Sequence, residues 1–212
     1  MSNRAILINA PVFTSDPNRL QEALDQEGRE YVEIAESAYR IPIPWLCCFR
    51  KDDLRPFSAK SYSLDGTEER VALVAPCADI AAAKRNLTQS LSIFAAVAGD
   101  SEIARGYWEA AMAGLEDLPF PYLCIDPTDI LFMEDLDEGL ATFSGCFAGS
   151  LDALPSMKRL NFFEEGVVPY SQADLYSKLP EQLDDPARVN NAAALDAAYA
   201  SPEARFWYRR EE

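Results

Sequence analysis

Residues 70–118 limit the fold more than any other part of this sequence, because they predict a strand followed directly by two helices. An apolar run over residues 71–75 is ended by Pro76, which predicts a short buried strand. Apolar side chains then recur at helical spacing over residues 79–98 and again over residues 102–118. The short turn between these two stretches predicts an antiparallel helical hairpin.

The remaining segments predict a sheet against which this hairpin can pack. A strand is expected at residues 5–9, strand character at residues 121–135 that is broken at Asp126 and Pro127, and a further strand followed by a loop at residues 138–154. The pattern of residues 31–40 fits either a strand or a helix, and a short amphipathic helix is expected from Pro17.

The chain has no internal repeat, low-complexity tract or obvious linker. It has 212 residues, of which 49% are hydrophobic and 25% charged, as is typical of a globular protein with a core of its own. We therefore expect residues 1–212 to form a single α+β domain, in which a mixed or antiparallel sheet packs against the helical hairpin.

Charge is distributed unevenly along the chain. The sequence has 35 acidic and 19 basic residues, for a net charge of -16. Residues 1–106 hold 15 acids and 12 bases, whereas residues 107–212 hold 20 acids and 7 bases. Because an acidic surface repels nucleic acid and anionic lipid, neither is expected as a partner. Acidity serves solubility in many proteins, but it also steers basic proteins toward the surface.

Neither a membrane span nor a secretory signal is expected. Every apolar run is shorter than the roughly 20 residues that a span requires, and the N-terminus lacks a long apolar region with a cleavage site. Five cysteines at irregular spacings argue against a disulfide framework. These features predict a cytoplasmic location.

The sequence contains no histidine, and this absence excludes several classes of catalytic and metal site. Without imidazole there is no Ser-His-Asp triad, no Cys-His dyad and no histidine-ligated zinc. The chain also lacks a Walker A motif and a Gly-x-Gly-x-x-Gly loop. The groups that remain available for catalysis are carboxylates, lysine and cysteine without a histidine partner. We predict no catalytic residue, metal ligand or cofactor.

Residues 41–56 combine a tryptophan, two adjacent cysteines and a run of charge. Arg50 or Lys51 could activate the Cys47 thiol as a nucleophile. However, cysteine is among the most buried residue types, and both thiols lie in an apolar run. We interpret the segment as core with its charged end as a solvated exit. Adjacent side chains on a strand point to opposite faces, so Cys47 and Cys48 are not expected to share a metal.

Residues 116–138 contain eight carboxylates and no lysine or arginine. They fit solvated surface, a divalent-metal site at Asp126 and Asp129, or a face that docks onto a cationic protein. Apolar neighbours among the acids favour the docking face over the metal site. The predicted partner-binding residues are Glu116, Asp117, Phe132, Met133, Glu134, Asp135, Asp137 and Glu138. At the C-terminus, residues 204–212 place three aromatic side chains among arginines, and we expect these rings to dock into the core.

Two stretches, MSNRAILINA at the N-terminus and YRIPIPWLCCFRKDDL at residues 39–54, resemble a group of small bacterial proteins whose setting suggests immunity proteins for contact-delivered or type VI-secreted toxins. The match covers about the first quarter of the chain. This resemblance implies a cytoplasmic, non-enzymatic protein that occludes the active site of a cognate toxin with a basic surface. The alternatives are a carboxylate-dependent hydrolase, with or without a divalent metal, and a structural subunit of a larger assembly.

Overall fold

The computed structural model describes most of the first three quarters of the chain. The described residues are 3–13, 31–38, 40–62, 68–98, 101–133 and 135–160, together with two short strands at 168–169 and 188–189. The helix predicted from Pro17 and the aromatic segment 204–212 lie outside them, so both stay predictions.

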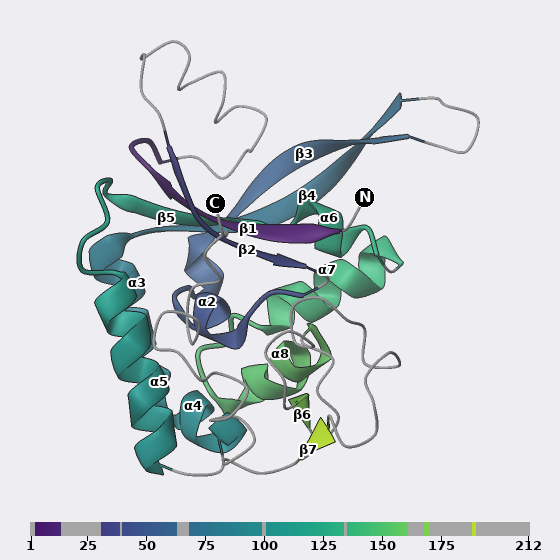
Figure 1. Cartoon of the computed structure of the whole chain (residues 1–212). Coiled ribbons are helices and arrows are strands. Elements are labelled where there is room, and N and C mark those ends of the chain that lie inside the picture. The colour runs from purple at the N-terminus through teal and green to yellow at the C-terminus, as the bar shows by residue number, and fades with distance from the viewer. Residues whose placement is uncertain are drawn as a thin grey trace.

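Five strands form one antiparallel sheet in the order β2-β1-β5-β4-β3 (Figure 1). They are β1 (Arg4–Ala10), β2 (Val32–Ala38), β3 (Leu54–Tyr62), β4 (Glu68–Asp79) and β5 (Tyr122–Asp126). Two short strands, β6 (Val168–Pro169) and β7 (Arg188–Val189), pair with each other. The strand predicted at residues 5–9 is confirmed, and so is the strand character before Asp126. The strand character predicted after Pro127 was wrong, because residues 128–131 are helical. Residues 31–40 contain a strand rather than a helix.

Most of the helices lie on one side of this sheet, below it in Figure 1. The helices of the described residues are α2 (Ile43–Cys47), α3 (Ile80–Gln89), α4 (Leu91–Ala98), α5 (Ser101–Gly114), α6 (Thr128–Leu131), α7 (Leu136–Gly145) and α8 (Leu154–Leu160), with 3-10 turns η1 (Lys51–Asp53) and η2 (Leu151–Ala153). The fold is therefore α+β, with an antiparallel sheet packed against helices, as the sequence predicts.

The two faces of the sheet carry separate apolar clusters, because successive side chains of a strand alternate between faces. On the helix side, Leu7 of β1 and Leu123 of β5 are fully buried with the helices in the main core. The opposite face carries a smaller cluster formed by Ile8, Ala10, Cys77 and Cys124. The central strands β1 and β5 therefore have buried apolar side chains on both faces of the sheet.

A buried asparagine positions the loop that leads into β5. Asn9 of β1 is fully buried, and its side-chain amide donates to the carbonyl oxygens of Phe120 at 2.9 Å and Tyr122 at 2.8 Å. Its side-chain oxygen accepts the Phe120 amide at 2.9 Å. Burial of this polar group therefore costs little, since its donors and acceptor are paired.

The helix predicted over residues 79–98 is two helices, α3 and α4, separated at Ser90. Ser90 is fully buried, and its hydroxyl donates to the carbonyl of Asn86 and accepts from the guanidinium of Arg50. The break turns Leu91 outward, where its side chain is 40% exposed. The prediction of one helix was wrong because a contact 40 residues distant in sequence ends α3. The predicted hairpin is formed by α4 and α5, which pack against each other.

The strand predicted at residues 71–75 is longer than expected and continues through Pro76. β4 pairs with β3 as far as Pro76, and from Cys77 onward it pairs with β5. Proline lacks an N–H donor, so it fits where a strand changes its pairing partner.

Residues 138–154, predicted as a strand followed by a loop, instead contain most of α7. The Asp135 carboxylate caps this helix, because its Oδ1 accepts two backbone amides of the first turn at 3.1 and 3.2 Å. Thr142 and Phe143, whose residue types favour strands, are buried on one face of the helix. Asp135 as an N-cap indicates that a helix starts here, and the strand prediction did not take this residue into account.

Candidate functional site

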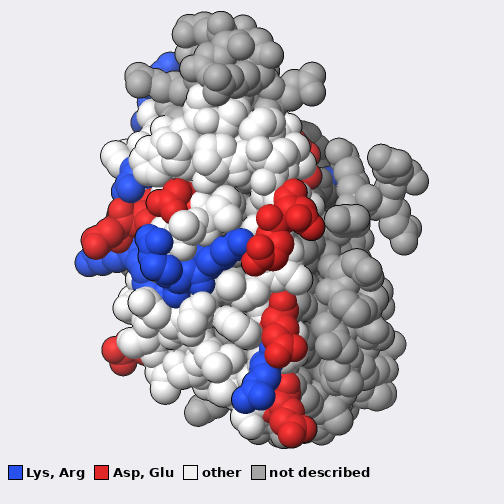
Figure 2. All heavy atoms as spheres, turned by 90° about the vertical axis from the view of Figure 1, so that its left-hand side faces the viewer, with Lys and Arg blue, Asp and Glu red and all other residues white. Residues whose placement is uncertain are grey.

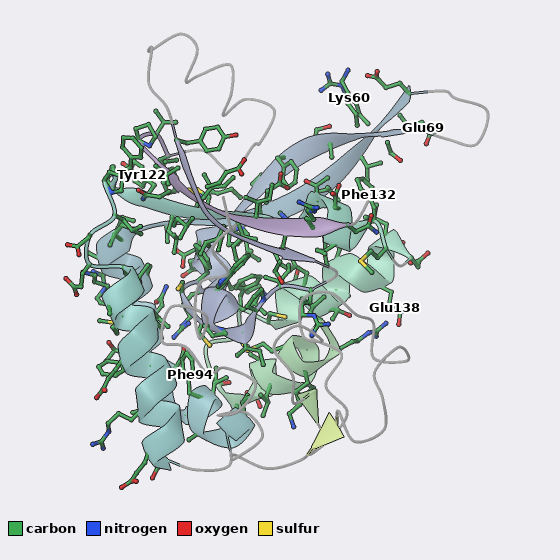
Figure 3. The ribbon with its side chains drawn as sticks, viewed as in Figure 1. Lys60, Glu69, Phe94, Tyr122, Phe132 and Glu138 are labelled. Atoms are coloured by element: carbon green, nitrogen blue, oxygen red, sulfur yellow. The ribbon has the colours of Figure 1, made fainter. Side chains whose placement is uncertain are left out.

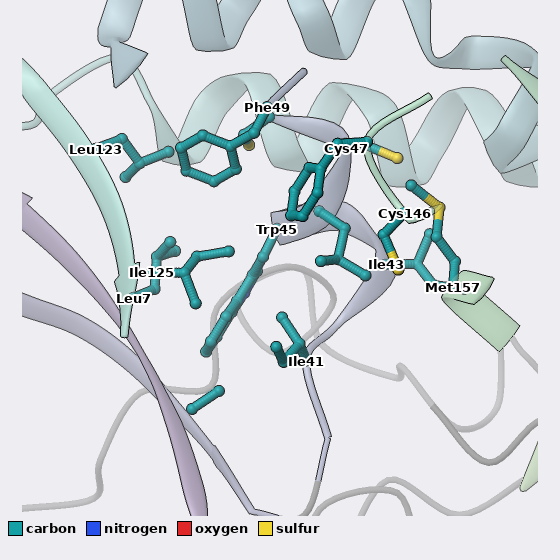
Figure 4. Close-up of a cluster of buried hydrophobic side chains, with 14 of the residues drawn as sticks. Leu7, Ile41, Ile43, Trp45, Cys47, Phe49, Leu123, Ile125, Cys146 and Met157 are labelled. Atoms are coloured by element: carbon teal, nitrogen blue, oxygen red, sulfur yellow. The ribbon is translucent and has the colours of Figure 1, made fainter. Parts of the chain in front are cut away.

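Residues 41–49 form core, as predicted, but this apolar part is helical rather than extended. Trp45, Cys47 and Cys48 are fully buried in and beside α2 (Figure 4). The Cys48 thiol donates to the carbonyl of Pro44, one helical turn earlier, at 3.4 Å. Two adjacent thiols can therefore both point into the protein, which a strand would not allow.

The environment of Cys47 keeps its thiol protonated. Burial raises the pKa of Cys47 to about 12, although a hydrogen bond with Ser90 and the charge of Arg50 lower it. Burial also raises the pKa of Cys48 well above its usual value. Because the thiolate is the reactive form, a nucleophilic role for Cys47 is not supported, and the interpretation of this segment as core is confirmed.

Arg50, which we expected at a solvated exit, is half-buried and joins α2 to α3. Its Nη1 donates to the carbonyl oxygens of Cys47 at 3.3 Å and Phe49 at 2.8 Å. Its Nη2 donates to the carbonyl of Asn86 at 2.6 Å and the hydroxyl of Ser90 at 3.0 Å. The carbonyl groups of Cys47 and Asn86 lie in the last turns of α2 and α3, where carbonyl groups lack intrahelical partners. The prediction for Arg50 was wrong because the guanidinium supplies those partners.

Two further contacts bring residues 147–149, which follow α7, close to Arg50 and Lys51. The Lys51 amide donates to the carbonyl of Phe147 at 3.1 Å. Gly149 has φ 75°, and a Cβ at this position would lie 2.8 Å from Cδ of Arg50. Glycine is thus required both by the backbone conformation and by the close approach. The Arg50 surroundings are a structural junction whose donors bind the protein's own backbone.

Replacing Arg50 with methionine is expected to lower the free energy of unfolding by about 2–4 kcal/mol, because several partly buried carbonyl groups lose their donor. An Arg50→Lys control should recover only part of this loss, since an ammonium group cannot reproduce the planar fork. Urea unfolding of the purified variants measures both effects. A stability of Arg50→Met equal to that of the wild type would show that water replaces the guanidinium without cost.

The predicted partner-binding residues are divided between the two ends of β5. Glu116 and Asp117 precede β5, and the Glu116 carboxylate forms an ion pair with Lys84 of α3 at 3.0 Å. Figure 2 shows the side of the molecule that carries α3 and α5, where lysine and arginine side chains gather in a band flanked by acidic groups. Charge on this side is mixed, so Glu116 does not lie in a purely acidic surface.

The other predicted residues gather where α6 turns into α7, which we call the acidic corner. Its described members are Phe132, Met133, Asp135, Asp137 and Glu138, and Glu134 lies outside the described residues. The Phe132 side chain is 36% exposed, whereas Met133 packs partly buried against the main core. Figure 3 shows Phe132 and Glu138 on the same side of the molecule, at the opposite end of β5 from Tyr122.

Several carboxylates of the acidic corner have contacts within the protein. Asp135 caps α7, and Glu138 forms an ion pair with Arg159 of α8 at 2.7 Å. Asp137 is exposed in the first turn, where its charge also favours the helix dipole. These contacts join the corner to α7 and α8, while Asp137 and Phe132 are exposed at the surface.

Asp126 and Asp129, the alternative metal site, differ in their exposure to solvent. Oδ1 of Asp126 accepts the backbone amide of Thr128 at 3.0 Å and its hydroxyl at 2.6 Å, at the start of α6. Burial raises the pKa of Asp126, these hydrogen bonds lower it, and the nearby charge of Asp129 raises it. Asp129 is exposed. Within the described ranges, no group of three or more Cys, Asp or Glu side chains is arranged to hold a metal ion.

Comparison with other proteins adds no family assignment: no family model matches the chain, and neither does any curated protein or solved structure. Among the helices that the structure describes, none combines the length and the apolar character needed to cross a bilayer. The geometry of the acidic corner therefore carries the functional interpretation.

Proposed function

We propose that this chain is a cytoplasmic, non-enzymatic immunity protein that binds a basic protein toxin and covers its active site. The observation that carries the proposal is the acidic corner, where the exposed ring of Phe132 lies beside carboxylates at the start of α7. An exposed aromatic ring next to like charges is typical of a surface that binds a charged partner.

Contacts within the fold position the described part of the acidic corner. Met133 packs against the main core, Asp135 caps α7, and α7 packs against α8. A surface that is already ordered loses little conformational entropy on binding, so more of the contact energy is available for affinity.

Charge supports a basic partner. The whole chain has a net charge of -16, and most of this excess lies in its second half, which includes the acidic corner. Enzymes that act on nucleic acids or nucleotides have cationic active sites, to which an acidic surface is complementary. A toxin of this kind is therefore the partner class that we propose.

The proposal predicts that Asp137→Lys slows association with the partner by about tenfold at low salt, because a carboxylate that attracts the partner is replaced by a repelling charge. Phe132→Ala should instead accelerate dissociation, because it removes the aromatic anchor. Glu109→Lys, at an exposed position of α5, is the matched control with the same change in net charge. The tagged variants would be used for affinity capture from lysate of the source organism, followed by kinetics against the captured protein.

The expected result is a basic protein that is captured by the wild type and by Glu109→Lys but poorly by the two corner variants. Co-expression of that protein with the wild type should restore growth that it inhibits alone. If all three variants bind equally well, the acidic corner is not the interface. If the captured protein does not inhibit growth, the immunity role is wrong even where the interface is right.

A further inference from the structure

We infer that Cys77 and Cys124 are a redox pair that forms a disulfide across β4 and β5. The two cysteines are directly opposite each other in the antiparallel ladder, and their Sγ atoms lie 2.8 Å apart. Neither is part of a disulfide in this structure. The inference is independent of the proposed toxin binding, since it concerns the middle of β5 and its pairing with β4, not the acidic corner.

The backbone already has the geometry that a disulfide needs. Opposed residues in antiparallel strands have Cα atoms about 4.5 or 5.5 Å apart, and both values lie within the range of about 4.4–6.8 Å found across disulfides. The sulfur atoms must approach by about 0.8 Å to reach a bond length of about 2.05 Å. Small changes of the side-chain torsions can supply this movement without changing the strand register.

The other three cysteines lie in a different part of the molecule. Cys47, Cys48 and Cys146 belong to the main core on the helix side, whereas Cys77 and Cys124 belong to the cluster on the opposite face of the sheet. The sheet therefore separates the pair from the remaining thiols, and the specific bond Cys77–Cys124 is expected.

The pair lies in the shortest ladder of the five-stranded sheet. β3 and β4 are joined by nine residue pairs and β1 and β5 by five, but β4 and β5 are joined by only three. This junction holds the β3–β4 hairpin to the remainder of the sheet. A disulfide here would fix the two parts of the sheet to each other and close a loop that contains α3, α4 and α5.

Hydrogen peroxide is the oxidant class that we propose. One thiolate attacks the peroxide to give a sulfenic acid and water, and the second thiolate displaces the sulfenic oxygen as another water while the S–S bond forms. In total, two thiols lose two protons and two electrons, and one peroxide becomes two waters. Cys77 and Cys124 are 0% and 4% exposed, so the reaction requires brief opening of the short β4–β5 ladder and is expected to be slow.

The test is oxidation of the full-length, reduced protein with hydrogen peroxide, followed by alkylation of the remaining thiols and peptide mapping by mass spectrometry. We expect a Cys77–Cys124 cross-linked peptide and a Tm about 10 °C higher than that of the reduced protein, because the closed loop constrains the unfolded chain. Cys77→Ala and Cys124→Ala should lack the cross-link, and Cys146→Ala is the matched control that should retain it.

Mapping of the wild type alone decides the inference if the variants fold poorly. Oxidation that leaves both thiols open to alkylation after unfolding would overturn it, as would a cross-link that joins other cysteines instead. A cross-link that forms without any increase in Tm would show that the bond does not lock the β4–β5 junction, and would overturn the structural role proposed for it.

Discussion

Replacing Trp45 with alanine is expected to lower the free energy of unfolding by about 3–5 kcal/mol, which is the range for removing a fully buried tryptophan from a core. The indole is 0% exposed and belongs to α2, the short helix that fills the space beneath the sheet. Figure 4 shows it beside Leu7 and Ile125 of the sheet and Ile41 of its own segment.

Urea unfolding followed by circular dichroism measures this loss, and two variants serve as controls. Trp45→Phe keeps most of the apolar volume and should cost less than Trp45→Ala. Phe132→Ala removes an aromatic ring that is 36% exposed, and it should change stability by about 1 kcal/mol or less. If Trp45→Ala and Phe132→Ala proved equally stable, the central place of α2 in the core would be wrong.

The comparison of these two rings also separates stability from function. Both residues are aromatic. In the sequence, Trp45 lies beside the two adjacent cysteines and Phe132 lies among the acidic residues. The structure places the first in the core and the second at the surface. Only Phe132→Ala should therefore weaken partner binding in a protein that remains folded.

Elements with a strong local signal could be predicted from the sequence. The apolar runs of β1 and β5 are bounded by prolines, and the strand prediction held for both. The helix α7 could also have been found, because Asp135 directly precedes the helix as its N-cap. The break at Ser90 could not, since it depends on a hydrogen bond from Arg50.

The candidate site was predictable in its composition but not in its geometry. Pairing of Glu116 with Lys84, and of Glu138 with Arg159, depends on how separate helices pack, which a charge count does not reveal. The same holds for Cys77 and Cys124, which stand alone in the sequence and meet because β4 and β5 pair. Contacts of this kind require the strand order, and no local pattern contains it.

Alkaline pH is expected to destabilise this protein strongly because it buries thiols in their protonated form. Burial raises the pKa of Cys47 to about 12 and raises the pKa of Cys48 and Cys146 above the ordinary value of 9.0. The pKa of Cys124 is raised by its hydrogen bond with Cys77 and then by burial. Above about pH 9 the unfolded chain loses thiol protons that the folded chain keeps, so the free energy of unfolding falls as pH rises.

Each such thiol should lower the free energy of unfolding by at most about 1.4 kcal/mol for every pH unit between 9 and its folded pKa. Because several buried thiols contribute together, the loss is a substantial part of the stability of a typical domain. Urea unfolding between pH 7 and pH 11, in the presence of a reductant that keeps the thiols free, should therefore show a steep loss above pH 9.

The slope distinguishes thiol ionisation from the general effect of alkali on lysine and tyrosine. Cys146→Ala also creates a cavity, but that cost is the same at every pH, whereas the missing thiol makes the decline above pH 9 shallower by at most about 1.4 kcal/mol per unit. Cys48→Ala should reduce the slope in the same way. If both variants decline in parallel with the wild type, these thiols ionise as easily in the folded chain as in the unfolded one, and the interior around α2 admits water.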